Sequence, residues 1–165
     1  MFKHIEIPVS KFVKALPPTP DFDPIYRHVR LELADLEEEF VEWQESKGLQ
    51  PKTWLNPILF YAHPNTRTSV HTDNGGILQW SLNIVLGDSD VEMQWRKAEG
   101  GEVKNPDLDY TKFSDDTPIV KTTRLGRTLC RIGVPHVSFN HGPGVWILSL
   151  RTAPVGWFDV IRKFP

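Results

Sequence analysis

Short runs of β-forming residues, separated by turn residues, fill the chain from residue 58 onward and limit what it can fold into. Stretches such as NGG, GDSD and HGPG supply the turns between the runs. Short strands that alternate with turns in this way are typical of a β-sandwich or jelly roll. We therefore predict a mainly β (α+β) domain whose sandwich covers about residues 55–160. The expected strands are 58–62, 68–71, 77–86, 91–95, 118–123, 128–132, 136–140 and 145–151.

A helical pattern precedes these strands. Asp23 and Pro24 are the residue types that favour an N-cap and a first helical position. Apolar residues then recur at steps of three and four, at Ile25, Val29, Leu33, Leu36, Phe40 and Trp43. The pattern predicts one helix over about residues 24–47 that packs across the sheet. The C-terminal segment WFDVIRKF fits either an edge strand or a helical turn.

Composition places the chain among ordinary globular proteins. It has 165 residues, of which 39% are hydrophobic and 24% charged, with a net charge of −2. Such a length suits a single domain over residues 1–165, and the charge offers no basic excess for binding nucleic acid. No stretch approaches the roughly 18 apolar residues that a membrane span needs. We expect a soluble, cytoplasmic protein with neither nucleic acid nor membrane as a partner, and of unknown oligomeric state. Cys130 is the single cysteine, and its β-like surroundings favour a buried thiol.

Three residues have the types and spacing of a metal site. His71 and Asp73 stand at alternate positions of an extended segment, so their side chains leave it on the same face. A third ligand comes from His136 on a later strand, or from His141 at the start of the HGPG turn. A strand holds a ligand more firmly than a turn tip does, which favours His136. Two imidazoles and one carboxylate form the facial triad that binds non-haem Fe(II) and leaves coordination positions open. The set therefore predicts a metal-dependent oxygenase.

An arginine is expected beside this site. If HGPG closes a hairpin, the pairing of its two strands places Arg151 on the same face as His136, with Ser138, Asn140 and Ser149 as further polar lining. A guanidinium in that position suits a bidentate grip on a carboxylate. Arg127 and Arg131, on the preceding expected strand, are further candidates for this role.

In their order along the chain, four segments resemble the 2-oxoglutarate and Fe(II)-dependent oxygenases, especially small members related to prolyl and aspartyl/asparaginyl hydroxylases. The segments are VHTDNGG (70–76), WSLNIVL (80–86), VPHVSFN (134–140) and ILSLR (147–151). The resemblance implies a cupin-type double-stranded β-helix in which His71, Asp73 and His136 bind Fe(II). It also matches Tyr61 with a tyrosine that binds the cosubstrate 2-oxoglutarate in prolyl-hydroxylase-like members. It covers the chain from Tyr61 to Arg151, about half of its length.

The chain departs from this family at one position. Members usually carry Arg or Lys nine or ten residues after the distal histidine, where this chain has Val145 and Trp146. Arg151 restores the spacing if His141 is the ligand, or serves from further along its strand. Asn83 is equally well interpreted as a core amide or as a contact to the cosubstrate.

The resemblance implies hydroxylation of a C–H bond in an amino-acid side chain, free or in a peptide, or in a small metabolite. The polar segment 97–116 is expected to be a long loop that closes over the substrate as a lid. Two alternatives stay open. One is a cupin-type metalloprotein whose chemistry does not use 2-oxoglutarate, and the other is a non-catalytic β-sandwich that acts as a binding module.

Overall fold

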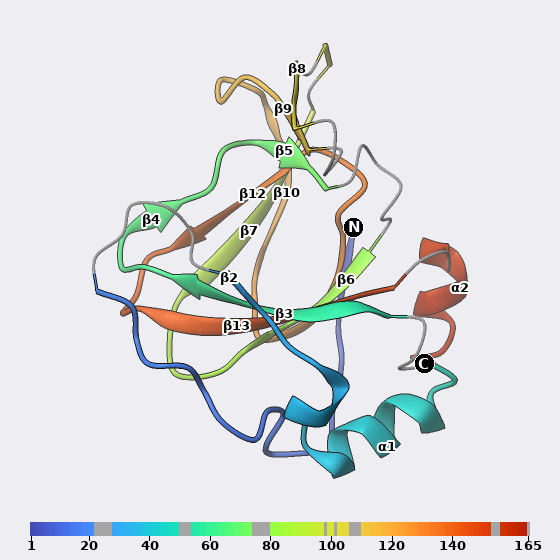
Figure 1. Ribbon diagram of the computed structural model, residues 1–165. Coiled ribbons are helices and arrows are strands. Elements are labelled where there is room, and N and C mark those ends of the chain that lie inside the picture. Colours follow the sequence, from blue (N-terminus) through green and yellow to red (C-terminus); the bar gives the residue numbers. More distant parts are fainter. Residues whose placement is uncertain are drawn as a thin grey trace.

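Two antiparallel sheets that pack face to face form the protein (Figure 1). The computed structural model describes residues 1–21, 28–49, 54–73, 80–97, 99–100, 102–105, 110–152 and 156–164. The first sheet has the order β1 (Phe2–His4), β11 (Arg127–Arg131), β6 (Trp80–Val85), β13 (Val145–Thr152), β3 (Trp54–Ala62) and β2 (His28–Arg30). The second has the order β10 (Ile119–Arg124), β7 (Val91–Arg96), β12 (His136–Asn140), β5 (His71–Thr72), β9 (Tyr110–Lys112) and β8 (Glu102–Asn105), with β4 (Thr66–Arg67) also paired to β12. The predicted mainly β, jelly-roll-like sandwich is confirmed.

Helices cover the outer face of the first sheet. They are a 3₁₀ turn η1 (Leu33–Asp35), α1 (Glu38–Ser46) and α2 (Trp157–Ile161). In Figure 1 α1 and α2 lie on the side of β13 and β3 that faces away from β5 and β12. Among the described residues, no helix is both long enough and apolar enough to cross a membrane.

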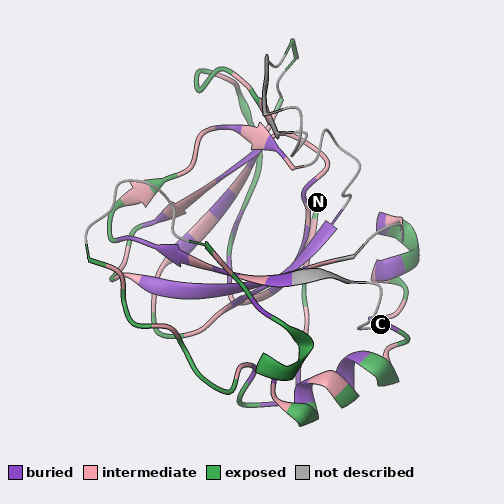
Figure 2. Cartoon of the chain, in the orientation of Figure 1, coloured by how far each residue is buried: buried purple, intermediate pink, exposed green. Residues whose placement is uncertain are grey.

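Alternation along β13 divides the apolar residues between two cores. Leu148 and Leu150 belong to the outer cluster together with Phe40 and Trp43 of α1, as the expected packing of a helix on the sheet requires. Ile147 points the other way, into the cluster between the two sheets. Burial of each large apolar side chain contributes roughly 1.5–3 kcal/mol. Figure 2 shows the resulting buried strands between more exposed loops and helix surfaces. Three tryptophans, Trp80, Trp95 and Trp146, are buried.

The predicted helix over residues 24–47 is wrong in its first half. His28–Arg30 form β2, in which Val29 pairs with Leu59 of β3, and α1 begins only at Glu38. The sheet edge offers these residues backbone partners, and the Leu31 N–H continues the contact by donating to Pro57 O at 2.7 Å. Leu33, which the helical pattern placed on the apolar face, is 39% exposed. Asp23, Pro24 and Ile25 lie outside the described residues.

Segment 97–116 is more ordered than a long loop. It contains β8 and β9, and β9 pairs with β5 through His71 and Lys112. Residues 98, 101 and 106–109 lie outside the described part. The predicted strand 68–71 is replaced by two short ones, β4 and β5, and the first residues of the predicted strand 77–86 are also not described. WFDVIRKF forms the helical turn α2.

The predicted HGPG hairpin is wrong, because β12 and β13 belong to different sheets. The turn is a corner that carries the chain from one sheet to the other. Asn140 holds this corner: its Nδ2 donates to Pro143 O at 2.8 Å, and its Oδ1 accepts from Gly142 N at 3.0 Å and from Ser89 Oγ at 2.8 Å. Nδ2 also donates to Ala62 O of β3, which ties the corner to the first sheet.

Candidate metal centre

His71, Asp73 and His136 converge at one end of the second sheet. His71 lies in β5, opposite His136 of β12, and the centroids of the two rings are 4.5 Å apart. Asp73 follows β5 directly; its Oδ1 is 3.7 Å from His71 Nε2 and its Oδ2 is 3.8 Å from His136 Nε2. One donor atom from each residue lies within 4.8 Å of the other two, so the three can reach a single ion. The structure therefore brings together the predicted triad.

Backbone carbonyls fix the tautomer of both histidines. His71 Nδ1 is 2.7 Å from Ser69 O, and His136 Nδ1 is 2.9 Å from Val134 O. A carbonyl oxygen only accepts hydrogen bonds, so each Nδ1 carries the proton. In a neutral imidazole the lone pair is then on Nε2, the atom nearest Asp73. Metal-binding histidines in proteins are oriented in this way by a hydrogen bond from the other ring nitrogen.

Electrostatics put His136 and Asp73 in a form that suits a cation. Burial, reinforced by His71, lowers the pKa of His136 to about 4, so its imidazole is neutral at pH 7. Burial raises the pKa of Asp73, but Arg151, His136 and His71 together outweigh burial and leave that pKa below its ordinary value. Asp73 is therefore ionised, and its contact with the neutral imidazole of His136 at pH 7 is not a pair of full charges. A neutral imidazole and an ionised carboxylate are the forms that bind metal ions.

Arg151 reaches the triad from the first sheet. Its Nη2 is 3.6 Å from Asp73 Oδ2, and its Cζ lies 5.3 Å from the centroid of the Phe60 ring. Arg151 therefore lies near the triad, but it comes from the facing sheet and not from a hairpin partner of the His136 strand as predicted. Ser149, on the same face of β13, is buried.

Ser81 is a residue of the site that the sequence reasoning missed. It pairs with Arg151 across β6 and β13, so the two side chains lie on the same face. Ser81 Oγ and Arg151 Nε are both buried without a hydrogen-bond partner among the described residues. A buried donor without a partner costs about 1–3 kcal/mol, so a ligand or a water molecule that supplies acceptors here would be bound favourably. The sequence pattern that could have indicated Ser81 is a polar residue between the apolar Trp80 and Leu82 of a predicted strand.

The other predicted site residues lie elsewhere. Tyr61 packs on the outer face of the first sheet, with its ring 5.1 Å from that of Trp146, and is not brought to the triad. His141 is exposed and its ring stacks on that of Phe139 at 5.4 Å, so His136, and not His141, is the second histidine of the cluster. Asn83 is buried and hydrogen-bonds the Cys130 thiol, whose predicted burial is confirmed.

The two candidate arginines of β11 contact the N-terminal segment. Arg127 Nη1 donates to Ile7 O, and its guanidinium lies 5.2 Å from the Phe12 ring centroid. The backbone N–H of Arg131 donates to Met1 O, and the charge of Arg131 adds to burial in lowering the pKa of the Met1 amine. The structure places both arginines in this packing role and not at the triad.

No known family model matches the chain, and no curated protein matches it. Among solved structures, the chain is similar to a hydroquinone 1,2-dioxygenase crystallised with Cd²⁺ and 4-hydroxybenzonitrile, with a TM-score of 0.39 and 14% sequence identity. The match covers 61% of this chain and 60% of that chain, so this chain corresponds to less than two thirds of that protein. A likeness this distant assigns neither a reaction nor a substrate.

Proposed function

We propose that the protein is a non-haem Fe(II)-dependent oxygenase that uses 2-oxoglutarate and hydroxylates a C–H bond of an amino-acid side chain or a small metabolite. The observation that carries the proposal is the cluster of two imidazoles and one ionised carboxylate at His71, Asp73 and His136. Three protein ligands of these types favour Fe(II) and leave positions open for further ligands. When bound, Fe(II) with 2-oxoglutarate would supply the activation of O₂ that hydroxylation requires.

Arg151 is the residue that we assign to the cosubstrate. Its contact with Asp73 is 3.6 Å, longer than the 2.7–2.9 Å or so of a strong charge-assisted hydrogen bond, so the guanidinium retains donors for a carboxylate. Ser81 Oγ stands beside it as a second buried donor. Val145 and Trp146, at the usual basic positions of the resembled family, are both buried in apolar clusters. Arg151 therefore takes over the role that those positions have in that family.

One observation favours a second candidate, a cupin-type metalloprotein that does not use 2-oxoglutarate. Arg151 already faces the carboxylate of Asp73, so its charge can serve to balance a metal ligand instead of holding a cosubstrate. This candidate predicts metal binding without any effect of 2-oxoglutarate. A non-catalytic binding module predicts no specific metal binding.

Anaerobic thermal unfolding of the metal-free protein separates these candidates. The protein is measured alone, with Fe(II), with 2-oxoglutarate and with both, beside His71→Ala and a His141→Ala control. A ligand at a hundred times its dissociation constant adds about 2.7 kcal/mol, which gives an easily measured shift. We expect the largest shift with both ligands, its loss in His71→Ala and its retention in His141→Ala.

Arg151→Met and Ser81→Ala refine the same experiment. Both variants should keep the shift caused by Fe(II) and lose most of the further shift caused by 2-oxoglutarate. A shift with Fe(II) alone, unchanged by 2-oxoglutarate in the wild type, would support the second candidate. If neither ligand stabilises the wild type, the proposed enzyme is wrong and the binding module is favoured.

A further inference from the structure

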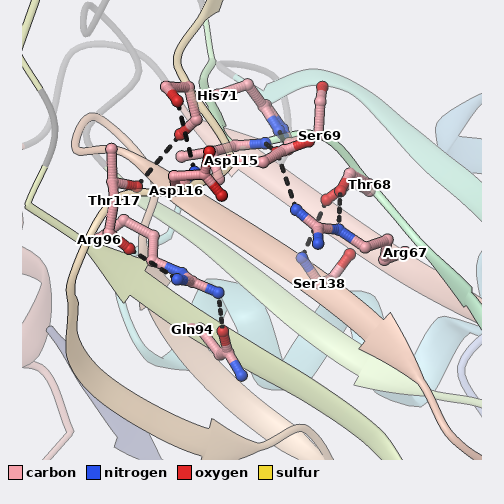
Figure 3. A network of polar contacts seen from close by, with 12 residues as sticks. Arg67, Thr68, Ser69, His71, Gln94, Arg96, Asp115, Asp116, Thr117 and Ser138 are labelled. Carbon is pink, nitrogen blue, oxygen red and sulfur yellow. Dashed lines mark hydrogen bonds and ion pairs between the residues drawn. The ribbon is translucent and has the colours of Figure 1, made fainter.

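The turn that follows β9 hydrogen-bonds both the backbone N–H and the backbone carbonyl of Val70, the residue before His71. Phe113 N donates to Val70 O at 2.8 Å, and Val70 N donates to the carboxylate Oδ1 of Asp115 at 3.3 Å. The same Oδ1 accepts from Arg67 Nη2 at 2.8 Å, so one carboxylate oxygen joins both ends of the segment 67–70 (Figure 3). Both peptide groups of Val70, which lies between β4 and β5, are thereby fixed by residues of the turn after β9.

This segment is also attached to the strand of His136. Thr68 N donates to Ser138 O at 2.9 Å, and Ser138 N donates to Thr68 Oγ1 at 2.9 Å. The next carbonyl along the segment, Ser69 O, accepts the hydrogen bond from His71 Nδ1 that orients the imidazole. A shift of residues 68–70 would therefore move both the backbone that carries His71 and the carbonyl that sets its ring.

The turn contacts the neighbourhood of the other histidine as well. Arg96 Nη1 donates to Thr117 O at 2.7 Å, and Arg96 Nη2 donates to Gln94 Oε1 (Figure 3). The backbone N–H of Arg96 donates to Pro135 O at 2.9 Å, immediately before His136. Residues 113–117 thus bridge the two segments that carry the metal-binding histidines.

We propose that Asp115 is a positioning residue of the metal centre, which with Arg67 fixes Val70 and so the place of His71 relative to His136. The inference rests on the proposed metal centre. The Arg67 and Asp115 side chains are 39% and 50% exposed, and exposed ion pairs contribute little to folding stability. Metal binding is more demanding, since ligands must be held within about 0.5 Å of their productive geometry. Asp115 should consequently affect the metal site more than it affects folding.

The test uses Co(II), whose visible absorption reports the geometry of its ligands, as a probe on the full-length protein. Asp115→Ala is compared with Asp116→Ala, an exposed neighbour of the same charge whose backbone N–H contacts Ser114 Oγ. We expect Asp115→Ala to bind Co(II) about tenfold more weakly and with an altered spectrum at saturation, and Asp116→Ala to stay within about twofold of wild type. Asp115→Asn keeps an acceptor for Val70 N and should restore most of the affinity.

Two results would overturn the assignment. One is an Asp115→Ala variant with the same Co(II) affinity and spectrum as Asp116→Ala. The other is an Asp115→Ala variant that binds Co(II) more weakly but has an unchanged spectrum at saturation, and whose metal-free form loses a matching free energy of unfolding in urea. That result would mean that Asp115 stabilises the fold and does not position the metal ligands. If wild type itself binds no Co(II), the metal centre is wrong and this inference falls with it.

Discussion

His71 and His136 are matched in both position and hydrogen bonding. They face each other across β5 and β12, and each Nδ1 donates to the carbonyl oxygen of the residue two positions earlier. Each ring is therefore held with Nε2 toward the same side, where Asp73 lies. Two histidines oriented alike around one ionised carboxylate are more readily explained by a shared ligand than by packing alone.

Acid should destabilise the metal-free protein between about pH 6.5 and pH 4. Burial lowers the pKa of His136 from 6.5 to about 4, so in this range the unfolded state binds a proton that the native state does not. The free energy of unfolding then falls as the pH falls, by about 3 kcal/mol at most from this residue. The ionised Asp73 also stabilises the native state, because its pKa is lowered there. That contribution is lost only when the pH falls below the ordinary pKa of an aspartate, which is lower than this range.

Urea unfolding across this pH range tests the assignment to His136. His136→Gln should remove most of the pH dependence, whereas the exposed His141→Gln should keep it. An unchanged pH dependence in His136→Gln would contradict the prediction.

Removal of Arg151 should be costly because it leaves Asp73 without its cation. Both side chains are largely buried, with 18% and 12% exposed, so we expect Arg151→Met, which leaves Asp73 without this partner, to lower the free energy of unfolding of the metal-free protein by roughly 1–3 kcal/mol. In the double variant Arg151→Met/Asp73→Asn the carboxylate charge is also gone, and the loss should be smaller than the sum of the two single losses. Strict additivity in urea unfolding would show that the two residues do not interact.

Gly144 should not tolerate a side chain. A Cβ at this position would collide with Tyr61 Oη and lie 2.7 Å from Tyr61 Cζ, and Tyr61 is buried against Trp146. Gly144→Ala is expected to cost about 1–3 kcal/mol in thermal or urea unfolding. Gly126→Ala is the matched control, since its Cβ meets no atom within 4 Å and the variant should unfold like wild type. Equal stability of the two variants would refute this account of the Tyr61 packing.

Cys130 should be chemically silent in the native protein. Burial raises the pKa of its thiol to about 12, so little thiolate is present at pH 8. A thiol reagent such as 5,5′-dithiobis(2-nitrobenzoate) should react promptly in urea and hardly at all under native conditions. Rapid, complete modification of the native protein would mean that Cys130 is accessible.

Local patterns predicted the parts of the fold that depend on local geometry. The limits of β12 at His136 and Asn140 match the structure, and so does the shared face of His71 and Asp73, because side chains alternate along any strand. The preference for His136 over His141 also followed from local structure, since a strand residue points in a fixed direction.

These local patterns did not predict which strands pair with each other when they are distant in the sequence. Val29 fits a helix as well as a strand, and its strand state depends on Leu59 of β3, which is distant in sequence. The HGPG turn has the composition of a hairpin, yet the Asn140 side chain makes it a corner between sheets. Ser81 joined the site only through its pairing with Arg151, which no spacing in the sequence reveals.

The most direct test of the account is an anaerobic calorimetric titration of the metal-free protein with Fe(II), with wild type beside Asp73→Ala and His141→Ala, and with circular dichroism as a check of folding. The account predicts one Fe(II) per chain in wild type and in His141→Ala. Loss of a residue that only hydrogen-bonds a metal ligand weakens metal binding by up to about a hundredfold. Asp73→Ala removes a ligand itself and should weaken binding by more than that. Absence of binding in wild type, or equal binding by a folded Asp73→Ala, would contradict a metal centre at His71, Asp73 and His136.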